Sequence, residues 1–338
     1  MRERTTEIRD YILTACRDNA LNVAADAARQ YGISRQAAVR HLHALEDAGL
    51  VKSEGTKNVK RSRLVAVQKN SWKFKLAGLR EDVVWQDQLA PLLADLPQNV
   101  RDIWQFGVTE MINNAVDHSE GLWLTISFSR NALDTELSII DDGEGIFHRI
   151  QRLLGLYDAR ESIIELAKGK LTTDPQRHSG EGIFFTSRVF DSFVIISRNL
   201  FFSHQTEKDD WLIDSDSDVP GTSINLRLSN NSQRIIKDIY DEFAEPDEYA
   251  FNKTRVPVRL AIHEGEKLVS RSQAKRLVSR FDKFKTVILD FEGVEEIGQA
   301  FADEIFRVFA LMHPEVKLIT TNETPEVSQM INRALAIK

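Results

Sequence analysis

The stretch TEMINNAVDHSEG, residues 109–121, sets several polar side chains inside an apolar helical pattern. Glu110 and Asn114 lie four positions apart, so a helix carries both on one face. A carboxylate in such a place can move a proton, and an amide oxygen can bind a hard cation. Asn113 is better explained as a helix-surface or capping residue, whereas His118 fits a place beside a phosphate and a structural role equally well.

Three glycine motifs follow this helix. Alternating strands are predicted over residues 122–129 and 135–147, and a helix is predicted to open within residues 178–191. The motifs are Asp141-x-Gly143-x-Gly145 after the second strand, Gly180-x-Gly182 before the helix, and Gly221-Thr222 at the start of a later strand. A single Gly-x-Gly is weak evidence, but the ordered set is specific.

The ordered set Glu-x-x-x-Asn, Asp-x-Gly-x-Gly, Gly-x-Gly and Gly-Thr resembles the ATP-binding domain of the GHKL superfamily, over about residues 75–230. That superfamily includes gyrases, heat-shock chaperones, histidine kinases and mismatch-repair ATPases. The resemblance implies a Bergerat-type α/β sandwich, in which helices cover one face of a mixed sheet. It also implies ATP and Mg²⁺ as cofactors.

The resemblance assigns a role to each motif residue. Asn114 would bind Mg²⁺ through its side-chain oxygen, and Glu110 would lie near the γ-phosphate as a general base. Asp141 would accept a hydrogen bond from the adenine amino group, and Thr222 would help to hold adenine. The other cofactor-binding residues are glycines that let the backbone turn around the nucleotide or that precede a helix N-terminus: Gly143, Gly145, Gly180 and Gly182.

Residues 146–179 correspond to the ATP lid of that family, with helical pieces expected near 150–156 and 161–168. Lys170 is expected to contact the phosphates when the lid closes. Further candidates, for which a solvated loop is the alternative, are Lys168, Arg177 and His178.

Other charged residues near the motifs are given no such role. Asp117 stands where many histidine kinases have a basic residue, so no phosphate contact is carried over to it. Asp142 and Glu144 are expected to be solvated loop charges.

The front of the chain, residues 1–66, is basic, with 12 Lys and Arg against 8 Asp and Glu, on an acidic remainder. The stretch ISRQAAVRHLHALEDAGLV and the alternating residues after it resemble a winged helix-turn-helix, which binds double-stranded DNA in many bacterial transcription regulators. Protein contact or dimerisation is the alternative use of such a module. The candidate DNA-binding residues lie on the second helix or the hairpin: Arg35, Gln36, Arg40, His43, Lys57, Lys60 and Arg61. The modest charge favours a homodimer that binds two half-sites.

We expect residues 67–230 to form the ATP-binding domain. Its lead-in, residues 67–100, is expected to be mostly helical, with Trp72 and Trp85 as core or interdomain aromatics.

Residues 240–338 alternate strands with helices and predict a small, largely parallel α/β unit. Strands are expected at 256–262, 285–294 and 315–321. The stretch VILDFEGVEEIGQAFADEI resembles a STAS domain, the fold of bacterial anti-sigma antagonists. Those antagonists carry a phosphorylatable Ser or Thr where this chain has Gly298-Gln299-Ala300. Ser270 and Ser272 precede another helix and are more simply explained as caps.

The fold class is therefore multidomain α/β. The single Cys16 excludes an internal disulfide, no apolar run is long enough to span a membrane, and MRERTTEIRD is no secretory signal, so we expect a cytoplasmic protein.

Three functions fit this pattern. The first is a transcription regulator that binds ATP, hydrolyses it slowly, and changes its DNA binding with nucleotide state, while its STAS-like unit supplies dimer or protein-partner contacts. The second is an anti-sigma-type serine/threonine kinase that acts on a STAS domain or another partner protein. The third is an ATP-binding scaffold without turnover. A histidine kinase is disfavoured, because no helix pair with an acceptor histidine precedes the ATP-binding domain.

Overall fold

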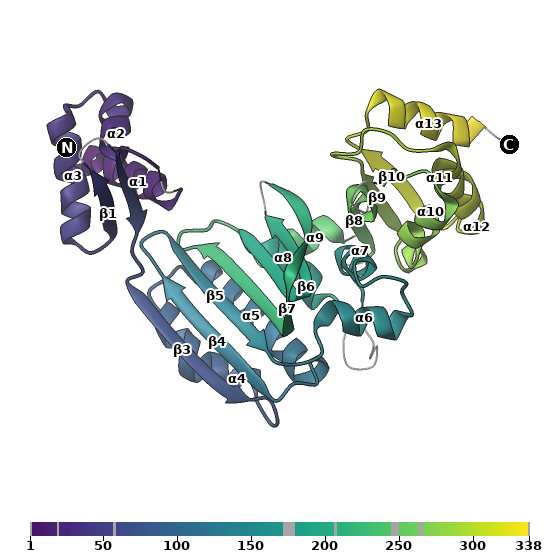
Figure 1. Ribbon diagram of the computed structural model, residues 1–338, viewed down its shortest axis with the longest axis horizontal. Coiled ribbons are helices and arrows are strands. Elements are labelled where there is room, and N and C mark those ends of the chain that lie inside the picture. The colour runs from purple at the N-terminus through teal and green to yellow at the C-terminus, as the bar shows by residue number, and fades with distance from the viewer. Residues whose placement is uncertain are drawn as a thin grey trace.

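The computed structural model describes residues 2–18, 20–56, 59–171, 180–205, 208–244, 250–262 and 266–336. Three units follow one another along the chain, and the central sheet lies between a helical N-terminal module and a C-terminal unit (Figure 1). The chain is therefore a multidomain α/β protein, as predicted. Within the described ranges, no helix combines the length and apolar character that crossing a bilayer requires.

The N-terminal module packs three helices and a hairpin around its own apolar core. Its elements are α1 (Arg2–Arg17), α2 (Val23–Tyr31), α3 (Arg35–Asp47), β1 (Val51–Thr56) and β2 (Val59–Leu64). Gly32 ends α2 in the left-handed region, with φ of 59°. The Ser34 hydroxyl caps α3 by accepting a hydrogen bond from the Ala37 N–H at 3.2 Å, as its place in the sequence predicts.

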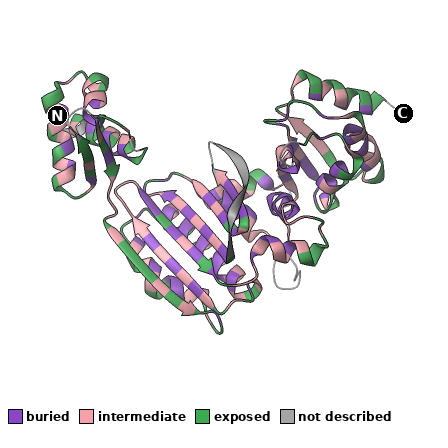
Figure 2. Cartoon of the chain, viewed as in Figure 1, coloured by how far each residue is buried: buried purple, intermediate pink, exposed green. Residues whose placement is uncertain are grey.

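The central unit is a five-stranded sheet in the order β3-β4-β5-β7-β6. Its strands are β3 (Gln68–Lys75), β4 (Trp123–Arg130), β5 (Asp134–Asp141), β6 (Ser192–Gln205) and β7 (Lys208–Ser229). All of its pairings are antiparallel, so the expected mixed sheet is wrong. Buried residues alternate along the strands, because one face packs on helices (Figure 2).

The helices of the central unit are α4 (Glu81–Val84), α5 (Gln98–His118), α6 (Ile146–Leu154), α7 (Glu161–Lys168), α8 (Gly182–Val189) and α9 (Ile236–Phe243). Helix α5 is long because its apolar positions recur at helical spacing, and most of them, including Ile103, Trp104 and Met111, are buried. Trp104 meets Phe190 edge-on, with ring centroids 4.9 Å apart.

The expected helical lead-in is wrong for residues 68–75, which form the edge strand β3. In that segment the half-buried Trp72 and Phe74 alternate with exposed Lys73 and Lys75, a period of two that suits a strand. Only the following stretch is helical, through α4, a π-type turn at Trp85–Leu89 and a 3₁₀ turn at Ala90–Leu93. Trp85 is buried in the core, as expected.

The C-terminal unit has three parallel strands in the order β10-β9-β8. Its elements are β8 (Lys253–Pro257), α10 (Arg271–Val278), β9 (Thr286–Asp290), α11 (Gln299–Asp303), α12 (Ala310–Met312), β10 (Lys317–Thr321) and α13 (Pro325–Ala336). A π-type turn at Glu304–Phe309 joins α11 to α12. The strand expected at 256–262 begins earlier and ends at Pro257, where a 3₁₀ turn begins.

The N-terminal module contacts the sheet at the start of β5. Leu133 packs on the core of that module, and the Arg17 guanidinium lies 3.8 Å from the buried Asp134 carboxylate. Burial raises the pKa of Asp134, although the nearby arginines Arg227 and Arg17 oppose that rise. The other end of the same strand, Asp141, belongs to the site described next.

Candidate functional site

A cavity of about 250 Å³ opens between helices α5 and α6, strands β5 and β7, residues 166 and 171 at and just after the end of α7, and the start of α8. Its lining combines apolar side chains with a few polar groups, the usual composition of a ligand site. The polar or glycine residues in the lining are Glu110, Asn114, His118, Ser119, Asp141, Gly145, Arg149, Gly180, Gly182 and Thr222.

Helix α5 supplies Glu110 and Asn114 to the cavity from one face, as their spacing predicts. Glu110 lies against the glycine turn before α8, because a Cβ added to Gly182 would stand only 2.1 Å from Glu110 Oε2. Within the described part of the chain, the buried Asn114 Nδ2 has no hydrogen-bond partner. A buried amide with unused capacity beside a cavity fits a site that is completed by a ligand.

Asp141 ends β5 and lies 8% exposed at the base of the cavity. Its Oδ1 accepts hydrogen bonds from the Gly143 N–H at 2.9 Å and from the Thr222 N–H at 3.2 Å. Burial raises the pKa of this carboxyl, while these backbone donors pull it down. The Thr222 hydroxyl accepts from the Ile146 N–H at 3.0 Å, so the segment that begins at Asp141 and the Gly221-Thr222 pair hold each other.

Gly221 is the position where a side chain is least tolerable. Its φ is +85°, and an added Cβ would lie 2.0 Å from the carbonyl oxygen of Asp141. Gly221 therefore permits the close backbone approach that sets Asp141 and Thr222 side by side.

We expect Gly221→Ala to lower the free energy of unfolding by about 3 kcal/mol or more, because backbone strain and steric overlap add. Gly155→Ala is the matched control, since Gly155 also has a positive φ of 63° but nothing within 4 Å of an added Cβ. The control should cost only about 1–2 kcal/mol. Chemical denaturation of both variants measures the difference, and equal losses would contradict this account of Gly221.

Seven residues chosen from the sequence line the cavity, namely Glu110, Asn114, Asp141, Gly145, Gly180, Gly182 and Thr222. Gly143 is not in the lining, but its N–H donates a hydrogen bond to the lining residue Asp141. Lys170 is not in the lining, since its Nζ donates to Asn252 Oδ1 at 3.2 Å and to the Lys283 carbonyl at 2.9 Å. The lid candidates Arg177 and His178 lie outside the described residues.

The residues that received no role lie off the cavity lining. Asp142 Oδ1 accepts from the Leu122 and Trp123 N–H groups, and Glu144 is paired with Arg152 at 2.6 Å. Asn113 and Asp117 are likewise absent from the lining.

Sequence reasoning missed Arg149, which lies on the first turns of α6 and is 17% exposed. Its NH1 is 2.6 Å from Glu120 Oε1, so this lining residue is also held by an ion pair. Tyr240 of α9 is not in the cavity lining, but burial and the charges of Glu181 and Glu110 raise its pKa to about 12.

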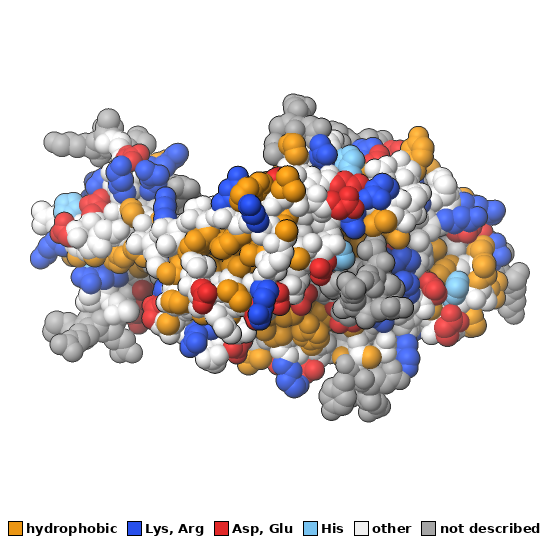
Figure 3. Space-filling view, turned by 90° about the horizontal axis from the view of Figure 1, so that it is seen from below, with side chains coloured by type: hydrophobic (Ala, Val, Ile, Leu, Met, Phe, Trp, Pro, Cys, Tyr) orange, Lys and Arg blue, Asp and Glu red, His pale blue; other side chains and the backbone are white. Residues whose placement is uncertain are grey.

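The N-terminal module offers a separate exposed surface. Arg35, Gln36, Arg40 and His43 are all exposed on α3, opposite the buried Ala38, Leu42 and Leu45. Arg61 is exposed on the hairpin, whereas Lys60 Nζ donates to Glu46 Oε1 at 3.3 Å. Basic side chains gather at this end of the molecule (Figure 3). Lys57 lies outside the described residues.

Comparison with known families identifies part of the C-terminal unit. The family model described as a STAS-like domain of unknown function (DUF4325) matches residues 273–328, which run from α10 into α13. The C-terminal part of the chain is therefore a STAS-like domain, as its sequence predicts. No curated protein matches the chain.

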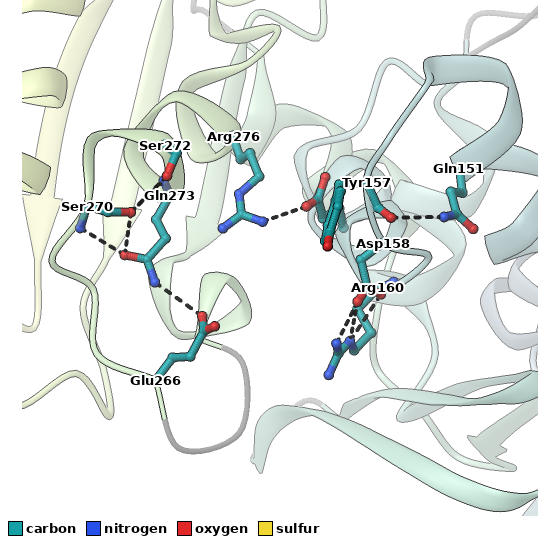
Figure 4. A network of polar contacts seen from close by, with 10 residues as sticks. Gln151, Tyr157, Asp158, Arg160, Glu266, Ser270, Ser272, Gln273 and Arg276 are labelled. Atoms are coloured by element: carbon teal, nitrogen blue, oxygen red, sulfur yellow. Dashed lines mark hydrogen bonds and ion pairs between the residues drawn. The ribbon is translucent and has the colours of Figure 1, made fainter.

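Ser270 caps α10, as expected, because its hydroxyl accepts a hydrogen bond from the Gln273 N–H at 3.2 Å within a capping box. The Ser272 hydroxyl lies 3.0 Å from that of Ser270 (Figure 4).

Proposed function

We propose that this protein binds ATP with Mg²⁺ in the cavity beside α5, hydrolyses it slowly, and uses the nucleotide state to control DNA binding by its N-terminal module. The central unit would then be a GHKL-type ATP-binding domain and the N-terminal module a winged helix-turn-helix. The observation that carries the proposal is the meeting of the separate sequence motifs around one cavity.

The lining residues fit a magnesium nucleotide. The described residues hold no group of three or more His, Cys, Asp or Glu side chains suited to a metal ion. Mg²⁺ bound with a nucleotide needs only one or two protein oxygens, because phosphates and water supply the rest. Asn114 would provide that ligand, and the bound ion would neutralise phosphate charge.

The protein's own groups would divide the remaining work. Asp141, held by two backbone donors, would accept a hydrogen bond from an adenine amino group. Glu110 would orient a water molecule and take its proton. Gly180 and Gly182, at the start of α8, would let phosphate oxygens approach the helix N-terminus.

Strand β5 supports the link between nucleotide and DNA. Its last residue, Asp141, lines the cavity, and its first residue, Asp134, lies beside Arg17 of the N-terminal module. A strand is a rigid element, so a shift at one end would reach the other. Nucleotide binding would thereby favour one arrangement of the DNA-binding helices.

DNA binding is tested with Arg40→Ala in a titration of double-stranded DNA. We expect about a tenfold loss of affinity or more, since one arginine contact to a base is worth about 1–3 kcal/mol. Arg29→Ala is the matched control, because Arg29 is an exposed arginine of α2 that is paired with Asp26. The titrations are repeated without nucleotide, with ADP and with a non-hydrolysable ATP analogue.

Equal losses in both variants would argue against α3 as the recognition helix. DNA affinity that is identical in all three nucleotide states would remove the regulatory part of the proposal.

A serine/threonine kinase is the second candidate, and the STAS-like domain in the same chain favours it. Anti-sigma kinases combine this type of ATP-binding domain with STAS partners, by the resemblance drawn above. The stretch Gly298-Gln299-Ala300 lacks a hydroxyl acceptor, so phosphate would go to a separate partner or to Ser270 or Ser272.

A further inference from the structure

Helix α7 is the most thoroughly buried helix segment beside the cavity, although it carries three charges. All eight of its residues are buried, including Glu161, Glu165 and Lys168 (Figure 2). Charged side chains are almost never fully buried unless they are paired. The partners of these three side chains therefore identify the part of the protein against which α7 is buried.

Those partners come from the C-terminal unit. Arg276 NH1 donates to Glu161 Oε1 at 2.6 Å, and Arg280 NH1 donates to Glu165 Oε2 at 2.6 Å. Lys168 Nζ donates to Glu165 Oε1 at 2.6 Å. We call these five side chains the α7 clamp. In Figure 4, Arg276 points from α10 toward the segment that carries Asp158 and Arg160, just before α7.

Lys168 has no exposed surface and also donates to two backbone carbonyls of the C-terminal unit, at Arg276 (3.2 Å) and Ser279 (2.8 Å). Burial lowers its pKa to about 8, against the opposing charge of Glu165. The three acceptors, Glu165 Oε1 and the two carbonyls, match the three N–H donors of the ammonium group, so removal of α10 would leave part of a buried charge without partners.

The chain just after α7 is held in the same way. Gly169 and Lys170 both have positive φ, of 81° and 51°, and the carbonyls of both face Arg280. Arg280 NH2 donates to these carbonyls at 3.1 and 2.5 Å. A positive φ is costly at Lys170, so the Arg280 contacts and the Lys170 side-chain bonds must hold that conformation.

The same segment forms a wall of the nucleotide cavity on its other side. Leu166 of α7 and Leu171 both line the cavity. The Leu171 N–H donates to the Gly180 carbonyl at 3.1 Å, which ties the wall to the glycine turn before α8. The position of residues 166–171 thus sets both one wall and the phosphate end of the site.

We propose that the STAS-like domain positions this wall through the α7 clamp, so that nucleotide affinity depends on its contact with α7. The inference rests on the proposed nucleotide binding and adds its regulation. A partner that draws α10 away from α7 would weaken nucleotide binding, and bound nucleotide would by linkage strengthen the clamp. Arg276 and Arg280 are positioning residues, because they act through α7.

The test uses the full chain and measures ATP affinity by calorimetry with Mg²⁺. Arg276→Glu should raise the Kd about fivefold or more, within the usual range of couplings between sites. The charge swap Glu161→Arg with Arg276→Glu should bring the Kd back toward that of the wild type. Arg276 is one-third exposed, so the single variant should fold, and Arg276→Gln is a milder substitute.

Arg271→Glu is the matched control, since Arg271 lies on the same helix but pairs with Asp303 inside the C-terminal unit. Its Kd should equal that of the wild type. A wild-type chain that binds no ATP would overturn the proposed function and this inference with it. If the wild type binds ATP, an unchanged or lower Kd in Arg276→Glu, or no rescue by the swap, would overturn this inference alone.

Discussion

Asp141→Asn is expected to weaken ATP binding by about tenfold to a hundredfold, because a hydrogen bond to a charged group is worth about 1.5–3 kcal/mol. The amide oxygen of asparagine can still accept from the Gly143 and Thr222 N–H groups, so the local fold should survive. The other atom becomes an NH₂ group, which faces the adenine amino group as a second donor. Calorimetric titration of ATP measures the loss.

The neighbouring Asp142→Asn is the matched control. Asp142 bonds the N–H groups of Leu122 and Trp123 and is absent from the cavity lining. Its substitution should leave ATP affinity within about threefold of the wild type, as expected of a side chain outside the site. Wild-type affinity in Asp141→Asn would contradict nucleotide binding at this cavity.

The raised pKa of Asp141 adds a pH test of the same assignment. Because the folded pKa exceeds the ordinary 3.8, the native state binds more protons than the unfolded state between the two values. Acidification through that window should therefore raise the contribution of Asp141 to the free energy of unfolding of the unliganded protein. The same protonation removes the carboxylate that would accept the hydrogen bond from adenine. Wild-type ATP affinity should fall with acidification by more than that of Asp141→Asn.

Much of the site could be predicted because its chemistry is local in sequence. Glu110 and Asn114 share a helical face, so helical periodicity orients them. The roles expected of Asp141, the glycines and Thr222 come from the resemblance of their ordered motifs to the GHKL superfamily. Arg149 could not be found in this way. Arg149 lines the cavity and is paired with Glu120, a tertiary contact that its local sequence does not show.

The errors in the fold have equally physical causes. In β3 the sequence QKNSWKFK offers only two half-buried aromatics, a pattern too short to separate an edge strand from a helix. The contacts of Lys170 also could not be predicted from the local sequence. Its charge suits a phosphate, but Asn252 and the Lys283 carbonyl, more than eighty residues later, hold it.

Glu110→Gln is expected to reduce ATP turnover by about a hundredfold or more, since a positioned general base contributes about 10²–10⁴ in rate. Glutamine keeps the size of the side chain but cannot accept the proton, so ATP affinity should change little. Free phosphate and protein-bound label are followed together with γ-labelled ATP and Mg²⁺. Asp117→Asn, on the exposed side of the same helix, is the matched control and should retain turnover.

Gly182→Ala gives an independent check on the same carboxylate. An added Cβ would stand 2.1 Å from Glu110 Oε2, so the carboxylate must move away from the glycine turn. Turnover should then fall although Glu110 itself is intact. Phosphate release that persists in both variants would remove Glu110 from the mechanism. Label that appears on Ser270 or Ser272 and is lost in Glu110→Gln would instead favour the kinase, because the same base would then activate a hydroxyl rather than water.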